Sequence, residues 1–311
     1  MQNNLAFVFP GQGSQAVSML SDFADNDIVK NTFSEASKAL GYDMWELVSE
    51  GPAEKLNQTN YTQPALLTAS VALWRLWESQ SEVRPALLAG HSLGEYSALV
   101  CAGVLSLEDG VKLVEKRGEF MQEAVPAGVG AMAAVIGLGD AEIIDACEKA
   151  ADNEVVSAVN FNSPGQVVIA GNKDAVERAG ELCKEAGAKR VLPLPVSVPS
   201  HCALMKPAAD KLAEQLANIE FSEPNTPVIN NVDVSIESSS AAIKEALIKQ
   251  LYSPVRWTET IEKMAGSGVE KVIEVGPGKV LQGLNKRINK SISSVSLNDN
   301  ASLEKSLELI K

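Results

Sequence analysis

Residues 86–95, with the sequence ALLAGHSLGE, decide the fold class of this chain. Residues 86–89 form a short apolar run, and a helical pattern resumes at Glu95. Between them, residues 90–94 match G-x-S-x-G, a sharp turn that joins a strand to a helix and exposes its serine at the top of a sheet. This order predicts an α/β protein with Ser92 as a nucleophile. The alternative is an ordinary glycine-rich turn whose serine only caps the helix.

Strands and helices alternate on both sides of this turn. Such alternation predicts a mostly parallel sheet that is covered by helices on both faces. The expected strands are 5–9, 86–89, 228–230 and 271–275. The expected helices are 27–48, 66–77, 95–102, 107–123, 204–217, 241–251, 258–265 and 280–288, and the last of these is expected to close the chain.

A different pattern begins after Pro126, where residues 127–130 are rich in glycine. Strands and helices then follow in the order βαββαβ, which is typical of a ferredoxin-like unit. We expect residues 128–197 to form this subdomain, inserted into a catalytic α/β core made of residues 1–127 and 198–311. The expected strands of the subdomain are 131–136, 155–160, 166–170 and 190–194, and its expected helices are 141–151 and 173–186.

The composition excludes several classes of function. The 311 residues include 27 basic and 40 acidic side chains, so the net charge of −13 disfavours nucleic acid and anionic membranes as partners. Four cysteines without a CxxC pair and only two histidines give no indication of a metal site or a disulfide framework. The N-terminal residues lack the basic stretch of a secretory signal. We therefore expect a cytoplasmic protein without a metal. We also expect it to be a monomer.

A serine nucleophile needs a base to take its proton. His91 adjoins Ser92, and neighbouring side chains diverge at a tight turn, so His201 is the expected base. No carboxylate stands out as the third member of a triad. Three acidic residues remain open for that position, and so does a backbone carbonyl. The three are Asp210, Asp233 and Glu274.

Arg117 is the one charged residue of helix 107–123 that falls outside its polar face, and it lies on the same side as Met121. A guanidinium directed towards an interior needs an anionic partner. That partner is either a structural glutamate or a substrate carboxylate. Snorkelling of the side chain towards water is the remaining alternative.

Two glycine-rich loops resemble nucleotide-binding motifs without completing them. Residues 11–16 fit G-x-G-x-x-A, but residues 31–40 are helical where a dinucleotide fold needs a second strand, so NAD is not expected. The backbone of this loop can still donate to an oxyanion. Residues 276–278 lack the Gly-Lys-Ser/Thr ending of a P-loop.

Taken together, the motifs strongly resemble those of bacterial malonyl-CoA:acyl carrier protein transacylases. They are FPGQGSQ at 9–15, GHSLGE at 90–95, NSPGQ at 162–166, PSHC at 199–202 and EVGPG at 274–278. The resemblance covers essentially the whole chain. It implies an α/β-hydrolase-like parallel-sheet core with an inserted ferredoxin-like subdomain, in agreement with the pattern of strands and helices.

The resemblance also implies the roles of single residues. Ser92 is expected to be the nucleophile, and His201 the general base and then the general acid. The backbone N–H groups of Gln12 and Leu93 would form the oxyanion hole, and the main-chain carbonyl of Gln250 would orient the histidine. Arg117 would hold the malonyl carboxylate, with four further residues lining the substrate cleft. Those four are Gln63, Met121, Asn160 and Asn162.

A basic cluster surrounds helix 280–288 in this otherwise acidic chain and consists of Lys279, Lys286, Arg287 and Lys290. Such a cluster is either a solvated face or a docking site for an acidic partner. The resemblance favours docking of holo acyl carrier protein.

The implied reaction moves malonyl from malonyl-CoA to Ser92 and then to the phosphopantetheine thiol of acyl carrier protein, in a ping-pong scheme that supplies fatty acid elongation. CoA is the product, and no cofactor is bound. A serine esterase or thioesterase is the rival enzyme, but the HGGG-type oxyanion loop is absent and neutral esters give a buried arginine no role. A non-catalytic protein that binds the carrier is the remaining alternative.

Overall fold

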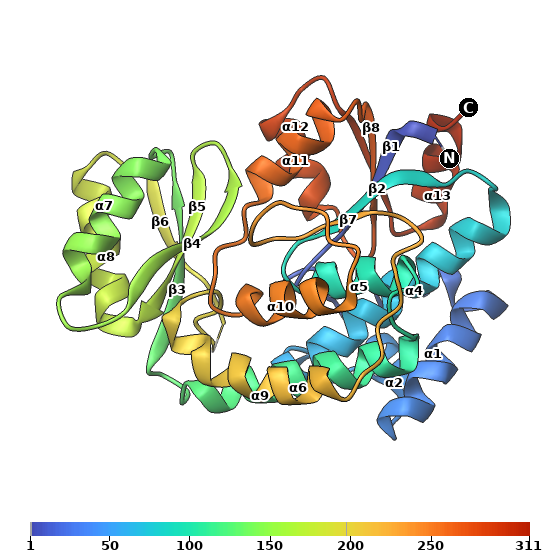
Figure 1. Ribbon diagram of the computed structural model, residues 1–311, viewed down its shortest axis with the longest axis horizontal. Coiled ribbons are helices and arrows are strands. Elements are labelled where there is room, and N and C mark those ends of the chain that lie inside the picture. The colour runs from blue at the N-terminus through green and yellow to red at the C-terminus, as the bar shows by residue number, and fades with distance from the viewer. Residues whose placement is uncertain (1, 197) are drawn as a thin grey trace.

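The computed structural model describes residues 2–196 and 198–311. Their strands form two separate sheets, which lie side by side in Figure 1. The larger sheet is parallel, and its strands in spatial order are β7 (Val228–Ile229), β2 (Pro85–Gly90), β1 (Gln2–Phe9), β8 (Lys271–Val275) and β9 (Ser293–Leu297). The α/β class predicted from the sequence is confirmed.

Helices cover both faces of the parallel sheet. Phe7 and Phe9 of β1 point to one face, where the Phe7 ring lies 5.1 Å from the Trp77 ring. Val8 points to the other face and packs in a core with Trp257. Because both faces are buried, the strand is apolar throughout instead of alternating.

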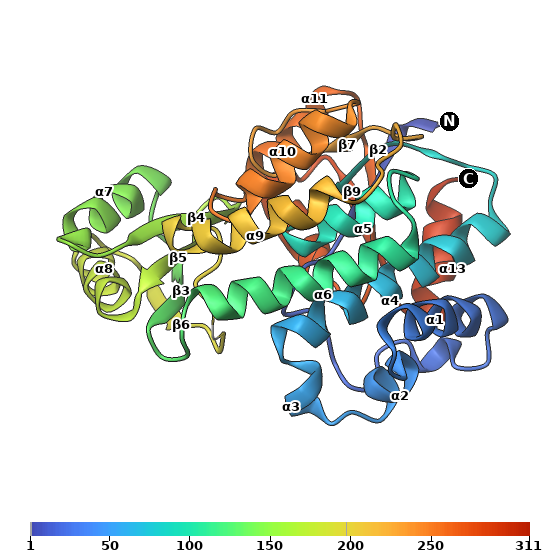
Figure 2. The ribbon, with the colours of Figure 1, turned by 60° about the horizontal axis from the view of Figure 1, so that its bottom comes forward.

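The first of these faces carries α1 (Asp27–Leu40), α2 (Met44–Ser49), α3 (Ala53–Leu56), α4 (Thr59–Gln80), α5 (Leu93–Cys101), α6 (Leu107–Ala124), α9 (Lys206–Ala217), α10 (Ser240–Gln250) and α13 (Asn300–Leu309). The second carries α11 (Trp257–Gly266) and α12 (Val280–Ile288). Figure 2 shows α6 and α9 running together towards the second sheet.

The second sheet is antiparallel and is built as the βαββαβ pattern predicts. Its strands β3 (Gly130–Ile136), β4 (Val156–Ser163), β5 (Gln166–Asn172) and β6 (Arg190–Pro193) stand in the order β4-β5-β3-β6. Helices α7 (Asp140–Ala151) and α8 (Lys173–Glu185) pack on its outer face. Residue 197, the predicted end of this subdomain, lies outside the described residues.

The antiparallel sheet is joined to the core next to the site. Val255 and the strand β4 pair through two backbone hydrogen bonds, from Phe161 N to Val255 O and from Val255 N to Val159 O. The inner face of the sheet, including Met132 and Val168, packs against Cys202. The residue that follows His201 is therefore fixed by contact with the second sheet.

Two expectations about the elements were wrong. The chain does not close with α12, because β9 and α13 follow it. The strand β9 contains three serines, and α13 begins with a capping box of Asp299 and Ser302 in place of the usual glutamate, so neither gives a strong signal. The expected helix 27–48 ends at Gly41, which has φ of 80°, and resumes as α2.

A short 3₁₀ helix, Ser21–Phe23, precedes α1, and another, Ala203–Met205, precedes α9. Within the described ranges, the helices are all too short or too polar to cross a membrane.

Candidate active site

Ser92 stands at the turn between β2 and α5, at the carboxyl end of the parallel strands. Its backbone has φ of 53° and ψ of −109°, a region that L-residues rarely adopt. The turn is tight enough that a Cβ on Gly90 would lie 1.8 Å from the carbonyl carbon of Gly94. A Cβ on Gly94 would lie 2.0 Å from the carbonyl oxygen of Phe9. Both glycines of the motif are therefore required by close backbone contacts.

His201 lies beside Ser92 although the two are far apart in sequence. Its Nε2 is 2.8 Å from the Ser92 Oγ, and its Nδ1 is 2.7 Å from the main-chain carbonyl oxygen of Gln250. A carbonyl only accepts hydrogen bonds, so Nδ1 carries the proton and Nε2 accepts the Ser92 hydroxyl. Burial, and then the charge of Arg117, lower the pKa of His201 to about 3. The ring is thus neutral and able to take a proton.

None of the three carboxylates considered as the third member of a triad contacts His201. Glu274 is buried, but it accepts the backbone N–H groups of Leu281 and Gln282 at the start of α12. Asp210 and Asp233 are exposed. The carbonyl of Gln250 therefore occupies the position that a triad carboxylate would take.

Arg117 is buried on α6, and its guanidinium reaches the serine. Nη1 donates to Gln63 Oε1 at 2.7 Å, and Nη2 donates to Gln250 Oε1 at 3.0 Å and to Ser92 Oγ at 3.3 Å. Within the described part of the chain, no carboxylate forms an ion pair with this guanidinium. A buried cation with only neutral acceptors is a suitable site for an incoming anion.

A cavity of about 600 Å³ opens onto these groups, between the core and the antiparallel sheet. Ser92, His201 and Arg117 line it from the core, and Met132 of β3 and Leu194, which follows β6, line it from the second sheet. The N–H of Leu93 belongs to the first turn of α5 and has no acceptor inside its own helix. Gln12 also lines the cavity. Both residues expected to bind an oxyanion are thus at the cavity wall.

Comparison with known proteins identifies the family of the chain. Residues 6–305 match the acyl transferase domain family. The malonyl CoA-acyl carrier protein transacylase of Salmonella typhimurium is 66% identical over 303 residues, which cover 97% of this chain and 98% of that protein. The chain belongs to this transacylase family. The corresponding protein of Bacillus subtilis is 46% identical over 99% of this chain and 98% of its own length.

Solved structures of the transacylase family have the same fold. An acyl carrier protein S-malonyltransferase from Vibrio cholerae is 67% identical, with a TM-score of 0.96 over 97% of this chain and 99% of that one. A malonyl-transacylase solved in complex with a type II polyketide acyl-carrier protein is 60% identical, with a TM-score of 0.97 over 98% and 99% of the two chains. The resemblance derived from the motifs is confirmed.

Two residues that the family resemblance assigns to the cleft wall lie behind it. Gln63 is fully buried, accepts from Arg117 and donates to Met121 Sδ at 3.6 Å. Asn162 is buried with its Oδ1 2.7 Å from His91 Nε2. Neither is among the described residues that line the cavity, whereas Met121 and Asn160 are. Gln63 and Asn162 instead contact Arg117 and His91, which line the cavity.

Sequence reasoning assigned no role to Glu95 or Asn231, both of which support the turn in this member of the transacylase family. Asn231 Oδ1 accepts the Ser92 N–H at 2.7 Å, and its Nδ2 donates to the Gly90 carbonyl at 2.7 Å. Glu95 is buried and accepts the Asn231 N–H at 3.0 Å. The only sequence feature that could have indicated a role for Glu95 is its position directly after the G-x-S-x-G motif. No sequence feature distinguishes Asn231.

The basic cluster lies apart from the cavity. Lys279, Lys286, Arg287 and Lys290 are all exposed at α12, and none of them lines the cavity. Arg287 Nη1 donates to Gln166 Oε1 at 2.6 Å, which links α12 to the antiparallel sheet.

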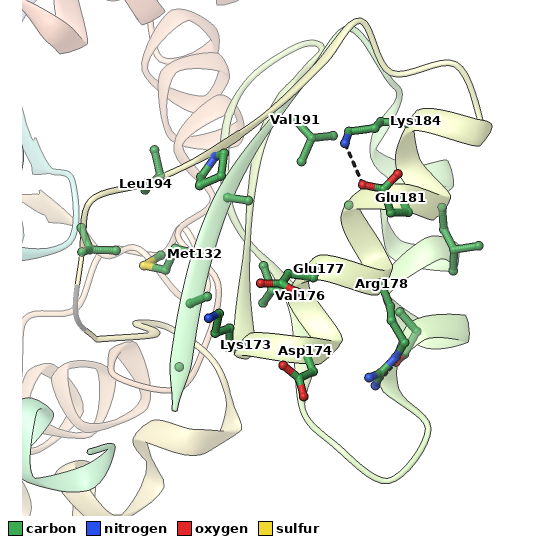
Figure 3. A pocket seen from close by; sticks show the side chains of 18 of the residues that line it. Met132, Lys173, Asp174, Val176, Glu177, Arg178, Glu181, Lys184, Val191 and Leu194 are labelled. Carbon is green, nitrogen blue, oxygen red and sulfur yellow. Dashed lines mark hydrogen bonds and ion pairs between the residues drawn. The ribbon is translucent and has the colours of Figure 1, made fainter. Parts of the chain in front are cut away.

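A second cavity, of about 1050 Å³, lies in the ferredoxin-like unit. Figure 3 shows it between α8, which bears Glu181 and Lys184, and the strand that bears Met132. Met132, Leu194 and Val196 line both cavities, so the two cavities adjoin at β3 and the residues that follow β6. The side chains of α8 that face the second cavity are of both charges, and Lys184 pairs with Glu181.

Proposed function

We propose that the chain transfers a malonyl group from malonyl-CoA to the phosphopantetheine thiol of holo acyl carrier protein through a malonyl-Ser92 intermediate. The observation that carries the proposal is the position of the Ser92 Oγ. It lies 2.8 Å from a neutral imidazole nitrogen of His201 and 3.3 Å from the guanidinium of Arg117. A nucleophile, its base and a carboxylate-binding cation therefore meet in one cavity. Membership in the transacylase family supports the same substrates.

In the first step His201 Nε2 takes the hydroxyl proton while the Ser92 Oγ attacks the thioester carbonyl of malonyl-CoA. The N–H groups of Gln12 and Leu93 stabilise the resulting oxyanion. The carbon–sulfur bond then breaks, and the CoA sulfur leaves with the proton that His201 returns.

In the second step the carrier thiol gives its proton to His201 and attacks the Ser92 ester. The same two N–H groups bind the second oxyanion. The serine leaves with the proton from His201 Nε2, and the malonyl group remains on the carrier sulfur. No cofactor enters either step.

Arg117 selects the malonyl group by pairing with its free carboxylate. Gln63 and Gln250 hold the guanidinium in place through their amide oxygens. Met121 and Asn160 line the same cavity and complete the binding site. A charge-assisted hydrogen bond contributes about 1.5–3 kcal/mol, and an acetyl group forfeits it.

The basic cluster on α12 is the proposed docking site for the carrier. One structural relative is described as a complex of a transacylase with an acyl-carrier protein. We also propose that the protein acts as a monomer in the cytoplasm, where its four free cysteines stay reduced. The proposed division is a core of residues 1–127 and 198–311 and a subdomain of residues 128–197.

A partition experiment tests the transfer against hydrolysis. The protein is mixed with malonyl-CoA and holo carrier, and malonyl-carrier and free malonate are measured together. We expect malonyl-carrier as the main product, and neither product from Ser92→Ala. Malonate release that is faster than transfer and independent of the carrier would indicate a thioesterase instead.

A further inference from the structure

A buried carboxylate lies next to the site and has no part in the proposed steps. Glu95 is only 2% exposed. One of its oxygens, Oε2, accepts both the Asn231 N–H at 3.0 Å and the Gln250 side-chain Nε2 at 2.9 Å. Burial of a carboxylate costs free energy unless hydrogen bonds and a nearby cation compensate it.

The nearest compensating cation is Arg117, which is separated from Glu95 by the side-chain amide of Gln250. The Gln250 side chain donates through Nε2 to Glu95 and accepts through Oε1 from Arg117 Nη2 at 3.0 Å. Opposite charges separated by a single amide group interact more strongly in a buried site than in water. Burial raises the pKa of Glu95 to about 7, and the hydrogen bonds from Gln250 and Asn231, followed by the charge of Arg117, oppose that rise.

Gln250 also connects this pair to the catalytic groups. Its Nε2 donates to the Ser92 carbonyl at 3.0 Å, and its own carbonyl accepts from His201 Nδ1. The Glu95 carboxylate therefore fixes the orientation of the amide that supports both the cation and the serine.

We propose that Glu95 is a positioning residue that sets acyl specificity by serving as the internal counter-charge of Arg117. This inference rests on the proposed function, in which Arg117 receives the malonyl carboxylate. In the empty site the guanidinium has one carboxylate nearby, on the far side of the Gln250 amide. With malonyl bound, two carboxylates compete for the charge of the same guanidinium, so an ionised Glu95 weakens the binding of malonyl. Acetyl carries no charge and is insensitive to this competition.

Glu95→Gln separates charge from hydrogen bonding. Because both hydrogen bonds reach a single oxygen, the amide oxygen of glutamine can accept both of them. We expect the ratio of kcat/KM for malonyl-CoA over acetyl-CoA to rise about tenfold, the factor that corresponds to one pKa unit of charge coupling. The change should come from a lower KM for malonyl-CoA. A ratio within twofold of the wild type would overturn the proposal.

Two further variants distinguish this role from a merely structural one. Glu95→Asp keeps the charge, so its ratio should stay near the wild-type value even if kcat falls. Glu274→Gln removes a different buried carboxylate, one that binds the start of α12, and should leave the ratio unchanged. A rise in the ratio with Glu274→Gln as large as that with Glu95→Gln would contradict a specific pairing with Arg117.

The pH dependence of the wild-type protein gives an independent test, which does not depend on whether a variant folds. The charged or titratable groups facing Glu95 are Arg117 from α6 and Tyr96 from its own helix, while Gln250 and Asn231 are neutral. Burial raises the pKa of Tyr96 to about 12, so it stays protonated. Among these groups, Glu95 alone changes charge between pH 6 and 8.5. The malonyl-over-acetyl ratio should fall severalfold as pH rises through this window, and a flat ratio would refute the proposal. Burial also raises the pKa of Glu274 to about 7, so the pH series is repeated with Glu274→Gln, which should show the same fall.

Different results would contradict the proposed function and the role of Glu95. If the wild-type protein takes no malonyl group from malonyl-CoA, the proposed function is wrong. If it does, and Arg117→Ala abolishes the preference while the Glu95 variants and pH leave the ratio unchanged, only the role of Glu95 is wrong.

Discussion

The main-chain carbonyl of Gln250 accepts a hydrogen bond from Nδ1 of His201 at 2.7 Å, where a Ser-His-Asp triad has a carboxylate. A neutral acceptor fixes the tautomer of the ring as a carboxylate does, but it does not stabilise the imidazolium by charge. The positive charge of the nearby Arg117 further disfavours a protonated His201 ring. The base is therefore held neutral in the resting site.

The pH dependence of acylation follows from this arrangement. Burial, and then Arg117, lower the pKa of His201 to about 3. An ordinary histidine has a pKa near 6.5, and a base of that kind would lose activity as the pH falls through that value. At saturating malonyl-CoA, the rate of Ser92 acylation should therefore not fall with a midpoint near pH 6.5. Rapid-quench measurements between pH 5 and 8 check this, and a midpoint at 6.5 would contradict it.

The same shift affects stability with a definite sign. Between pH 6.5 and 3 the unfolded chain binds a proton at His201 that the folded chain does not, so this contribution to folding stability decreases as pH falls through that window.

Arg117→Ala should narrow the preference for malonyl-CoA over acetyl-CoA by about ten- to a hundredfold, from the loss of about 1.5–3 kcal/mol. The ratio of kcat/KM values measures this. Arg75→Ala is the matched control, since Arg75 lies on the neighbouring α4 and pairs with Glu35. An unchanged ratio in Arg117→Ala would refute the carboxylate assignment.

Gly94→Ala should destabilise the fold by about 1–3 kcal/mol or more, because its Cβ would lie 2.0 Å from the Phe9 carbonyl oxygen. It should also lower kcat by displacing Ser92. Gly283→Ala on α12 meets nothing within 4 Å and should stabilise the protein by about 0.5–1 kcal/mol. Urea unfolding compares the two, and equal midpoints would argue against a tight turn.

Lys286→Glu should raise the KM for acyl carrier protein severalfold and leave loading from malonyl-CoA intact, because Lys286 is exposed on α12 and outside the cavity. Lys38→Glu makes the same charge change at an exposed position on α1. If both variants weaken carrier binding equally, net charge and not the α12 cluster is responsible.

The turn at Ser92 and the ferredoxin-like unit could be predicted because both are encoded locally. Residues 90–94 combine motif, preceding strand and following helix, and residues 131–194 alternate clearly between strand and helix periods. The strand β9 was not predicted because three of its five residues are serines, namely Ser293, Ser294 and Ser296, so its sequence lacks an apolar run. Its pairing with β8 defines it as a strand.

The supporting side chains could not be predicted, since their roles depend on contacts between distant segments. Gln63 lies 54 residues before Arg117, and Asn162 meets His91 across 71 residues. Nothing local distinguishes either amide from one that lines a cleft. The interior position of Arg117, by contrast, was visible from the helical period, although its partners were not.

The most direct test of the account is intact mass after brief incubation with malonyl-CoA, with acetyl-CoA in parallel. We predict the gain of one malonyl group that maps to Ser92, little acetylation, and no adduct on Ser92→Ala. The absence of an adduct on the wild-type protein, or an adduct that maps to another residue, would contradict the central claim that Ser92 carries the malonyl group.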